Sequence, residues 1–470
     1  MKRSIKTYIL AALIFLFLGV FLYFVGGDEL KYQTISTEME DASSVLPEIS
    51  EGVEVRQNLI IENDILEKIS IRMATYARTN TGILTLSLVD KKSGEALEQH
   101  QVDVSLLPGD TLYEWEFEEP LENCKGREMI LTAGATSPAG SGITFYMNQN
   151  ISDGNLSVNN EMISGIVCYS LQEKTSYWFG EYYWYIVAGL VGAVELYLLY
   201  SDWAEKKGRV TFIVHMKGIW NRYGFLIRQL VSRDFKTKYK RSALGYLWSF
   251  LNPLLSMLVQ YIVFSTLFKS DIENFPVYLL TGIVLFNFFS DAVGQGLGAI
   301  VINAALITKV YVPKYIYPVT KVASSSINLL ISIIPLFIVM LLTGQPFRKS
   351  LLLLPFPLIC LLVFCIGMSL LLSSSMVFFR DTQYLWGIVS LAWTYATPIF
   401  YPADIIPEKF ILIQKLNPMY HYIRFTRELL IAGVSPSIQE YAYCIIFSVG
   451  MLAIGALVFK KTQDKFILYI

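Results

Sequence analysis

The stretch from Leu226 to Pro253 reads LIRQLVSRDFKTKYKRSALGYLWSFLNP. Its first part is basic and amphipathic, and it continues without a break into a long apolar run. A segment of this kind is expected to lie along a membrane surface and then to turn into the bilayer. The stretch therefore predicts a membrane protein, and the segments around it decide which kind.

The composition agrees with this interpretation. Of the 470 residues, 54% are hydrophobic and 16% are charged, and the charges gather in blocks between apolar runs. Many of these runs are about 20 residues long, roughly the length that crosses a bilayer as a helix. The 38 basic and 39 acidic residues nearly balance, but acids crowd the region from Asp28 to Glu181. This segregation argues against nucleic acid as a partner.

The apolar runs predict a multi-pass α-helical protein with about eight transmembrane helices. They lie at Tyr8 to Val25, Tyr182 to Tyr200, Leu247 to Phe268, Pro276 to Leu297, Val319 to Thr343, Leu351 to Phe379, Leu385 to Phe400 and Ile438 to Phe459. Lysine and arginine favour the cytoplasmic side, and they flank the start of the first span and the end of the last. We therefore expect both termini in the cytoplasm and the segment between the first two spans outside.

This topology predicts five parts of the chain. They are an N-terminal transmembrane anchor at 1–26, an extracellular domain at 27–180, a second transmembrane helix at 181–201, a cytoplasmic linker with an amphipathic interface helix at 202–246, and a six-helix membrane domain at 247–470. Within the predicted spans the polar residues Glu195, Gln260, Asn287 and Asp291 stand out, because intramembrane polar groups are costly and are usually functional or paired.

The extracellular segment changes to a period of two. Leu84, Leu86 and Leu88 alternate with polar residues, and Trp115 and Phe117 alternate with glutamates. Such alternation is typical of half-buried antiparallel strands, so we expect an all-β sandwich of jelly-roll type with both aromatic side chains in its core. Turn residues separate the runs.

The sequence TYARTNTG at Thr75 to Gly82 resembles the start of sandwich modules on membrane proteins of bacterial surface-glycan pathways. Tyr76, Arg78 and Asn80 lie near a turn there and form either a sugar site or an ordinary solvated loop. Cys124 and Cys168 are both expected outside the cell, where a disulfide persists, but the sequence does not fix their distance. The three histidines are scattered, so we expect no metal site.

Beyond Arg222 the chain resembles the permeases of type 2 ABC exporters, in the branch that exports lipid-linked polysaccharides such as O antigens, capsules and wall teichoic acids. The matching stretches are RDFKTKYKRSALGYLWSFLNPLL at Arg233 to Leu255, LITKVYVPKYIYPV at Leu306 to Val319, FFRDTQ at Phe378 to Gln383, TPIFYP at Thr397 to Pro402, LNP at Leu416 to Pro418 and RELLIAG at Arg427 to Gly433. The anchored domain at the front departs from the simplest members of this family.

The resemblance implies roles for three groups of residues. A gate helix beside the ATPase and the lipid head group would use Arg228, Arg233, Lys236, Lys240 and Arg241, although a plain surface helix fits the periodicity equally well. Docking onto the ATPase would use Leu306, Ile307, Val310, Tyr311, Arg380 and Asp381. A glycan path at the outer mouth would use Phe400, Tyr401, Tyr420, Tyr422 and Phe425, for which an aromatic interfacial belt is the alternative.

The chain contains no Gly-Lys dipeptide, so it lacks the phosphate-binding loop of an ATPase. We expect a homodimer with two copies of a separate ATPase, which would bind the ATP and Mg²⁺, and no catalysis on this chain. A type 2 exporter of a drug or lipid is the nearest alternative. A membrane glycosyltransferase would need acidic clusters that are missing, and a sensor would need an inner signalling domain. The expected location is the bacterial cytoplasmic membrane.

Overall fold

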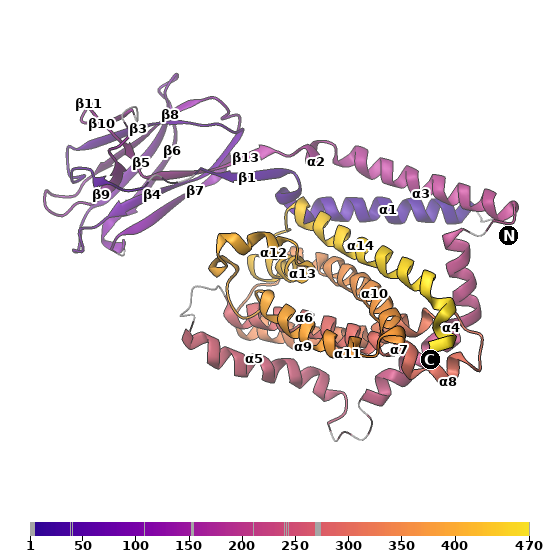
Figure 1. Cartoon of the computed structure of the whole chain (residues 1–470). Coiled ribbons are helices and arrows are strands. Elements are labelled where there is room, and N and C mark those ends of the chain that lie inside the picture. Colours follow the sequence, from indigo (N-terminus) through magenta and orange to yellow (C-terminus); the bar gives the residue numbers. More distant parts are fainter. Residues whose placement is uncertain are drawn as a thin grey trace. The chain divides into compact units, whose positions relative to one another are not determined.

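The computed structural model describes residues 5–37, 39, 41–107, 109–151, 155–209, 211–238, 240, 242, 244–267 and 274–469. The chain forms two compact units. Lys31–Tyr182 make the first, and Met1–Leu30 together with Tyr183–Ile470 make the second. We call them the β unit and the helical unit (Figure 1).

The β unit consists of two antiparallel sheets. One sheet has the order β1-β13-β4-β9-β12, with β2 paired to β9 and β7 paired to β4, and the other has the order β11-β10-β3-β8-β5-β6. The strands are β1 Tyr32–Ser36, β2 Ser44–Val45, β3 Glu54–Ile60, β4 Ile65–Ala74, β5 Ile83–Asp90, β6 Ala96–Asp103, β7 Thr111–Leu121, β8 Glu128–Ala135, β9 Thr144–Asn148, β10 Leu156–Val158, β11 Glu161–Ile163, β12 Ile166–Val167 and β13 Tyr169–Ser176. The prediction of an all-β antiparallel region is confirmed.

The predicted alternation corresponds to the core between the sheets. Leu84, Leu86 and Leu88 are fully buried, and Trp115 and Phe117 are buried against the same cluster. The thiol of Cys124 is free and donates to the carbonyl of Leu121 over 3.1 Å, so it forms no disulfide with Cys168.

The loop at Tyr76 is held by a network of hydrogen bonds that centres on Arg78. The guanidinium pairs with Glu48 (2.5 Å), donates to the carbonyl of Gly142 (3.0 Å) and donates to Asn80 (3.0 Å). It also lies 4.8 Å above the ring of Tyr76. Asn80 in turn is only 1% exposed. Asn80 is therefore not available to a sugar ligand, and the network explains Arg78 as a structural clamp.

The carboxylate of Glu48 also accepts hydrogen bonds from the amides of Gly142 and Gly140. Burial raises the pKa of this carboxyl, but the two amides and Arg78 outweigh burial and hold its pKa below the ordinary value of 4.5. A lowered carboxyl pKa stabilises the folded state at neutral pH, and that stability is lost as the pH falls through the folded-state pKa.

We predict that residues 31–182 fold when expressed alone and that Arg78→Ala destabilises them by about 1 to 2 kcal/mol at pH 7, because it removes the donor to Asn80 Oδ1 and the cation that pairs with Glu48. As the pH falls below 4.5 and then through the lower folded-state pKa of Glu48, the difference from wild type should shrink, because protonated Glu48 no longer pairs with the guanidinium. Urea unfolding followed by circular dichroism measures both effects, with Lys92→Ala as a surface control. Equal midpoints for Arg78→Ala and wild type at pH 7 would contradict the clamp.

The helical unit is built from long helices joined by short ones. The long helices are α1 Ile5–Gly26, α3 Tyr183–Lys206, α4 Phe212–Lys238, α5 Leu247–Leu267, α6 Phe275–Leu297, α9 Ile316–Leu342, α10 Pro355–Phe378, α11 Thr382–Ala396 and α14 Ile438–Thr462. The short ones are α7 Ala299–Ile302, α8 Ala304–Ile307, α12 Ile411–Lys415, α13 Pro418–Arg427, α15 Phe466–Tyr469, η1 Gly27–Leu30, η3 Lys349–Leu353, η4 Ala403–Ile405, η5 Glu408–Phe410, η6 Glu428–Ala432 and η7 Gln463–Lys465. In the β unit, α2 Trp178–Glu181 and η2 Val104–Leu106 are helical.

Seven segments in the described part of the chain are long and apolar enough to cross a membrane. They include α1, α3, α5, α6, α9, α10 and α14, so seven of the eight predicted spans have a matching helix. The predicted span at Leu385 to Phe400 corresponds to α11, which has 15 residues. A helix of that length is shorter than the roughly 20 residues that cross the hydrocarbon core.

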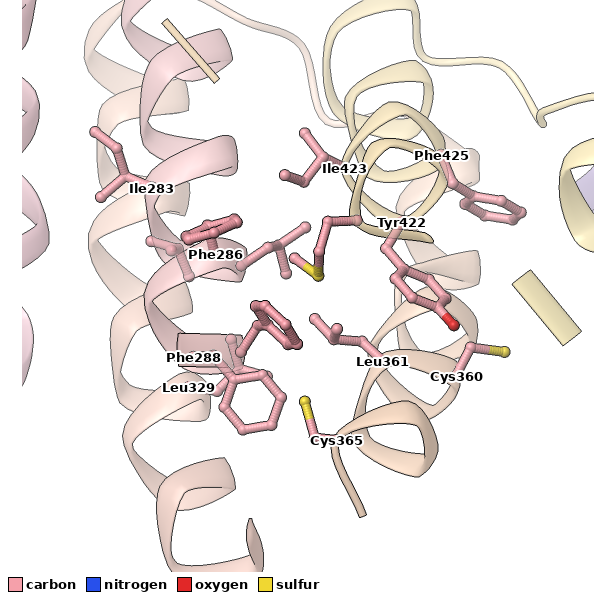
Figure 2. Packing of buried hydrophobic residues seen from close by; sticks show 14 of the residues in the cluster. Ile283, Phe286, Phe288, Leu329, Cys360, Leu361, Cys365, Tyr422, Ile423 and Phe425 are labelled. Carbon is pink, nitrogen blue, oxygen red and sulfur yellow. The ribbon is translucent and has the colours of Figure 1, made fainter. Parts of the chain in front are cut away.

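Helix α6 lies at the centre of the helical unit. Side chains on every face of it are buried, which distinguishes it from α1 and α3 with their largely exposed apolar surfaces. Figure 2 shows Phe286 and Phe288 of α6 beside Leu361 of α10 and Tyr422 of α13. One end of α6 continues into α7 and α8, and the other end lies near α12 and α13 (Figure 1).

Arg427 holds the irregular backbone at the α13 end of α6. The side chain is buried and donates to the carbonyls of Pro398 (2.7 Å), Ile399 (3.1 Å) and Tyr278 (3.1 Å). It lies 3.3 Å from the centre of the Tyr278 ring. Arg427 therefore satisfies carbonyls of the non-helical segment that follows α11.

We predict that Arg427→Met lowers the thermal midpoint of the full-length protein strongly, because each buried carbonyl left without a donor costs about 1 to 3 kcal/mol. The thermal midpoint of Arg427→Lys should lie between those of Arg427→Met and wild type. One ammonium cannot reach all three carbonyls with the geometry of a guanidinium. Arg380→Met, at an exposed arginine, is the matched control. A wild-type thermal midpoint for Arg427→Met would show that Arg427 does not hold this backbone.

Candidate functional site

Three helices of the helical unit carry polar side chains along one face. In α5 and in α9 the spacing is the same, with the second and third polar residue three and seven positions after the first. Residues at these spacings share one side of a helix. The stripes are Ser249, Asn252 and Ser256 on α5, Ser325, Asn328 and Ser332 on α9, and Asn287, Ser290 and Asp291 on α6. Together they line a cavity of about 730 Å³.

The sequence reasoning singled out Asn287 and Asp291 but missed the shared spacing. Ser249, Asn252 and Ser256 lie within a long apolar run, and so do the polar residues of α9. The repeated spacing of serine and asparagine in two spans is the signal that would have found the cavity. It was overlooked because each serine or asparagine alone is common in a membrane helix.

An ion pair forms part of the cavity lining. Lys238 Nζ, at the end of α4, donates to Asp291 Oδ1 and Oδ2 over 3.0 and 2.9 Å. Ser325 Oγ and Gln295 Nε2 donate to the same carboxylate over 2.9 and 3.0 Å. The carboxylate thus joins α4 to α6 and α9. This contact explains why Lys238 interrupts the apolar side of the amphipathic helix.

The stripes also bond to each other. Ser249 Oγ donates to Asn328 Oδ1 over 3.1 Å, and Ser332 Oγ donates to the carbonyl of Ser249 over 3.0 Å. By contrast, the side chains of Asn252 and Asn287 are exposed in the cavity wall, and so is the indole of Trp248, at 43%. Exposed amides beside an aromatic face provide hydrogen bonds and stacking, which suit a ligand rich in hydroxyl groups.

A second ion pair anchors α4. Asp234 pairs with Lys321 of α9 over 3.0 Å and with its neighbour Arg233 over 2.9 Å. Arg233 also donates to Asn303 over 3.3 Å. Both Asp234 and Lys321 are largely buried. Arg233, predicted as a gate residue, therefore lies where α4 meets the loop between α7 and α8.

The other predicted gate residues divide into two groups. Arg228 is exposed and lies 5.3 Å from the ring of Trp220, and Lys236 and Lys240 are exposed. Arg241 lies outside the described residues. Arg228 and Lys236 thus lie on the exposed arc of α4, as the amphipathic pattern predicts, and Lys240 lies beyond its end.

The loop from α7 to α9 exposes apolar side chains, but only some of the predicted ones. Ile307 is 8% exposed and packs into a cluster with Ile316 and Phe459, and Leu306 is half-buried. Ile307 is therefore a core residue and not part of a docking face. Val310 is exposed, and Tyr311 is 92% exposed.

Two further exposed groups lie near this loop. Ile302, on α7, is an exposed apolar side chain that the sequence reasoning did not single out. Arg380 and Asp381 follow α10, and both are exposed together with Phe379. The two corners are neighbours because α7 packs on α10. Exposed apolar groups at such a corner are typical of a protein contact surface.

The aromatic residues predicted to form a glycan path lie at the α13 end of the helices. Some of them are buried and others are partly exposed. Tyr422 and Phe425 are fully buried and pack in the core (Figure 2), so neither presents a face to a passing sugar. Phe400 stacks on Phe264 with ring centres 5.5 Å apart. Tyr401 donates to the carbonyl of Tyr395 over 2.7 Å. Partial exposure remains at Phe400, Tyr401 and Tyr420.

Comparison with known proteins identifies relatives of the helical unit. The family model of the ABC-2 type transporter matches residues 226–431. The O-antigen export system permease protein RfbA of Klebsiella pneumoniae is 31% identical over 250 residues, which is 52% of this chain and 95% of that protein. The polysialic acid transport protein KpsM of Escherichia coli is 24% identical over 245 residues, 51% of this chain and 93% of that protein.

The family model spans the described part of the cavity, the loop at Tyr311 and the segment held by Arg427. It leaves out α1, the β unit and α3, which precede it in the chain. At this identity and coverage the chain belongs to the permeases of the ABC-2 type transporters.

Proposed function

We propose that the chain is the membrane subunit of an ATP-driven exporter that moves a lipid-linked polysaccharide across the bacterial cytoplasmic membrane. O antigen, a teichoic acid and a capsule-like glycan are the substrate classes we consider. The cavity lined by serine, asparagine and Trp248 carries the proposal, since its groups suit hydroxyl-rich sugar units. The names of the relatives, which export O antigen and polysialic acid, support the same class.

The cavity would act as part of the sugar path. Neutral amide and hydroxyl groups bind each sugar unit by a few hydrogen bonds, which are modest in net strength, so a polymer is held without being trapped. The Lys238 and Asp291 pair forms part of its lining and would open or close it as α4 moves. This arrangement selects for sugar chemistry in general and not for one sequence of sugars.

The orientation follows from the charges around the helix ends. Lys309 and Lys314 lie near the α7 and α8 end of the helices, and Lys460 and Lys461 end α14. Since lysine prefers the cytoplasmic side, that end and both termini would lie in the cytoplasm. The β unit would then lie outside the cell.

Movement would be driven by a partner ATPase. Ile302, Val310 and Tyr311 are exposed apolar side chains that would insert into a groove of that partner, and the exposed Arg380 and Asp381 would add polar contacts. We propose a homodimer of this chain with two ATPase subunits, which bind ATP and Mg²⁺. The sequence lacks a phosphate-binding loop, which supports the assignment of ATP binding to the partner subunits.

We predict that Tyr311→Glu weakens capture of the ATPase by roughly tenfold or more, because an exposed aromatic anchor in a groove is a typical binding hot spot. The variant should remain folded. Ile307→Glu should instead unfold the loop, because it buries a charge. Co-purification of the ATPase measures docking, and thermal melting measures folding. Leu106→Glu, at an exposed residue of the β unit, is the control. Normal ATPase capture by Tyr311→Glu would contradict the docking surface.

We also predict that the double variant Asn252→Leu with Asn287→Leu slows glycan export by roughly tenfold, because two hydrogen bonds of about 0.5 to 1.5 kcal/mol each are lost along the path. Assembly with the ATPase should be unchanged. The measurement is ATP-driven glycan transport in reconstituted vesicles. Ser326→Ala, a serine of α9 outside the cavity lining, is the control. Wild-type transport by the double variant would exclude this cavity as the path.

A further inference from the structure

A second cavity, of about 480 Å³, lies between α12, α13 and the start of α14. It is separate from the cavity between α5, α6 and α9, because the two share no lining residue. Polar side chains line most of it, with Ile406 and Ile411 at its apolar side.

The cavity lies at the end of a membrane-spanning helix. Glu440 and Tyr443 belong to the first two turns of α14, whose span begins at Ile438. The neighbouring α12 exposes Leu412 and Ile413, which is expected where a short helix meets lipid. The cavity is therefore at the level of the lipid head groups.

The buried amide of Gln414 lacks a hydrogen-bond partner among the described residues, which indicates that a ligand binds here. Gln414 is 8% exposed and lines the cavity, and its Nε2 has no hydrogen-bond partner among the described residues. A buried amide without a partner destabilises a protein by about 1 to 3 kcal/mol, so such groups are normally satisfied by a ligand or water. Its neighbour Lys415 has an exposed side chain, and in the described part of the chain it has no ion pair.

The carboxylates nearby are already engaged. Glu440 accepts from His421 Nδ1 over 2.8 Å and pairs with Arg424 over 3.3 Å. Glu428 pairs with Arg424 over 2.8 Å. His421 Nε2 lies 2.8 Å from the carbonyl of Lys415. These contacts leave the Lys415 ammonium and the Gln414 amide as the groups that can attract a further anion.

We propose that this cavity binds the phosphate of an anionic membrane lipid, with Gln414 and Lys415 as donors. A phosphate provides the acceptor oxygens that the amide and the ammonium lack. The apolar neighbours Leu412 and Ile413 suit the acyl chains of the same molecule, which favours a lipid over free phosphate. Juxtamembrane cations commonly bind anionic lipid in this way.

The test uses full-length protein in neutral detergent, with phosphatidylglycerol added as the probe. A bound lipid raises the thermal midpoint in proportion to the logarithm of its concentration. We expect Lys415→Gln and Gln414→Leu to weaken the apparent lipid affinity by roughly tenfold. Lys409→Gln, which removes a nearby lysine outside the cavity, should respond like wild type.

Gln414→Leu also separates binding from folding. It removes an unpaired buried amide, so without lipid the variant should melt at or above the wild-type midpoint. The proposal is overturned if phosphatidylglycerol stabilises Lys415→Gln and Gln414→Leu as strongly as wild type. It is also overturned if inorganic phosphate at equal concentration gives the same stabilisation, because the ligand would then be a free anion and not a lipid.

Discussion

Main-chain polar groups inside a bilayer need partners within the protein, and Arg427 supplies them where the helices stop. Its guanidinium donates to three carbonyls from the segment after α11 and from α6. Without it the irregular stretch at Pro398 and Ile399 would leave carbonyls unpaired in an apolar environment. The neighbouring Gly282 makes room, since a side chain there would meet the guanidinium. These hydrogen bonds hold the end of α13 against α6.

The same constraint shapes the central cavity. Its polar residues are either bonded across helices, as Ser249 is to Asn328, or gathered on one open surface, as Asn252 and Asn287 are. Lys238 and Asp291 neutralise each other where a lone charge would be costly. A set of helices that is apolar toward lipid and polar toward this cavity therefore keeps its polar groups together without exposing unpaired charges to the membrane.

Burial separates structural from available residues in the docking loop, in the aromatic path and in the loop of the β unit. Ile307, Tyr422, Phe425 and Asn80 all carried a plausible chemistry in the sequence, yet each is buried and serves packing or hydrogen bonding. Tyr311 and Ile302 are exposed although they are apolar. Apolar side chains in a loop favour either a core or a contact surface, and hydrophobicity by itself does not distinguish the two.

The sequence by itself determined the membrane class, seven of the spans, the antiparallel β unit and the family, because these depend on composition, on periods of 3.6 and 2, and on runs of matching residues. Tertiary structure decided which residues meet. The partners of Asp291 come from α4, α6 and α9, and the carbonyls held by Arg427 are up to 149 positions away. Such contacts depend on how helices pack, and local periodicity contains no information about that.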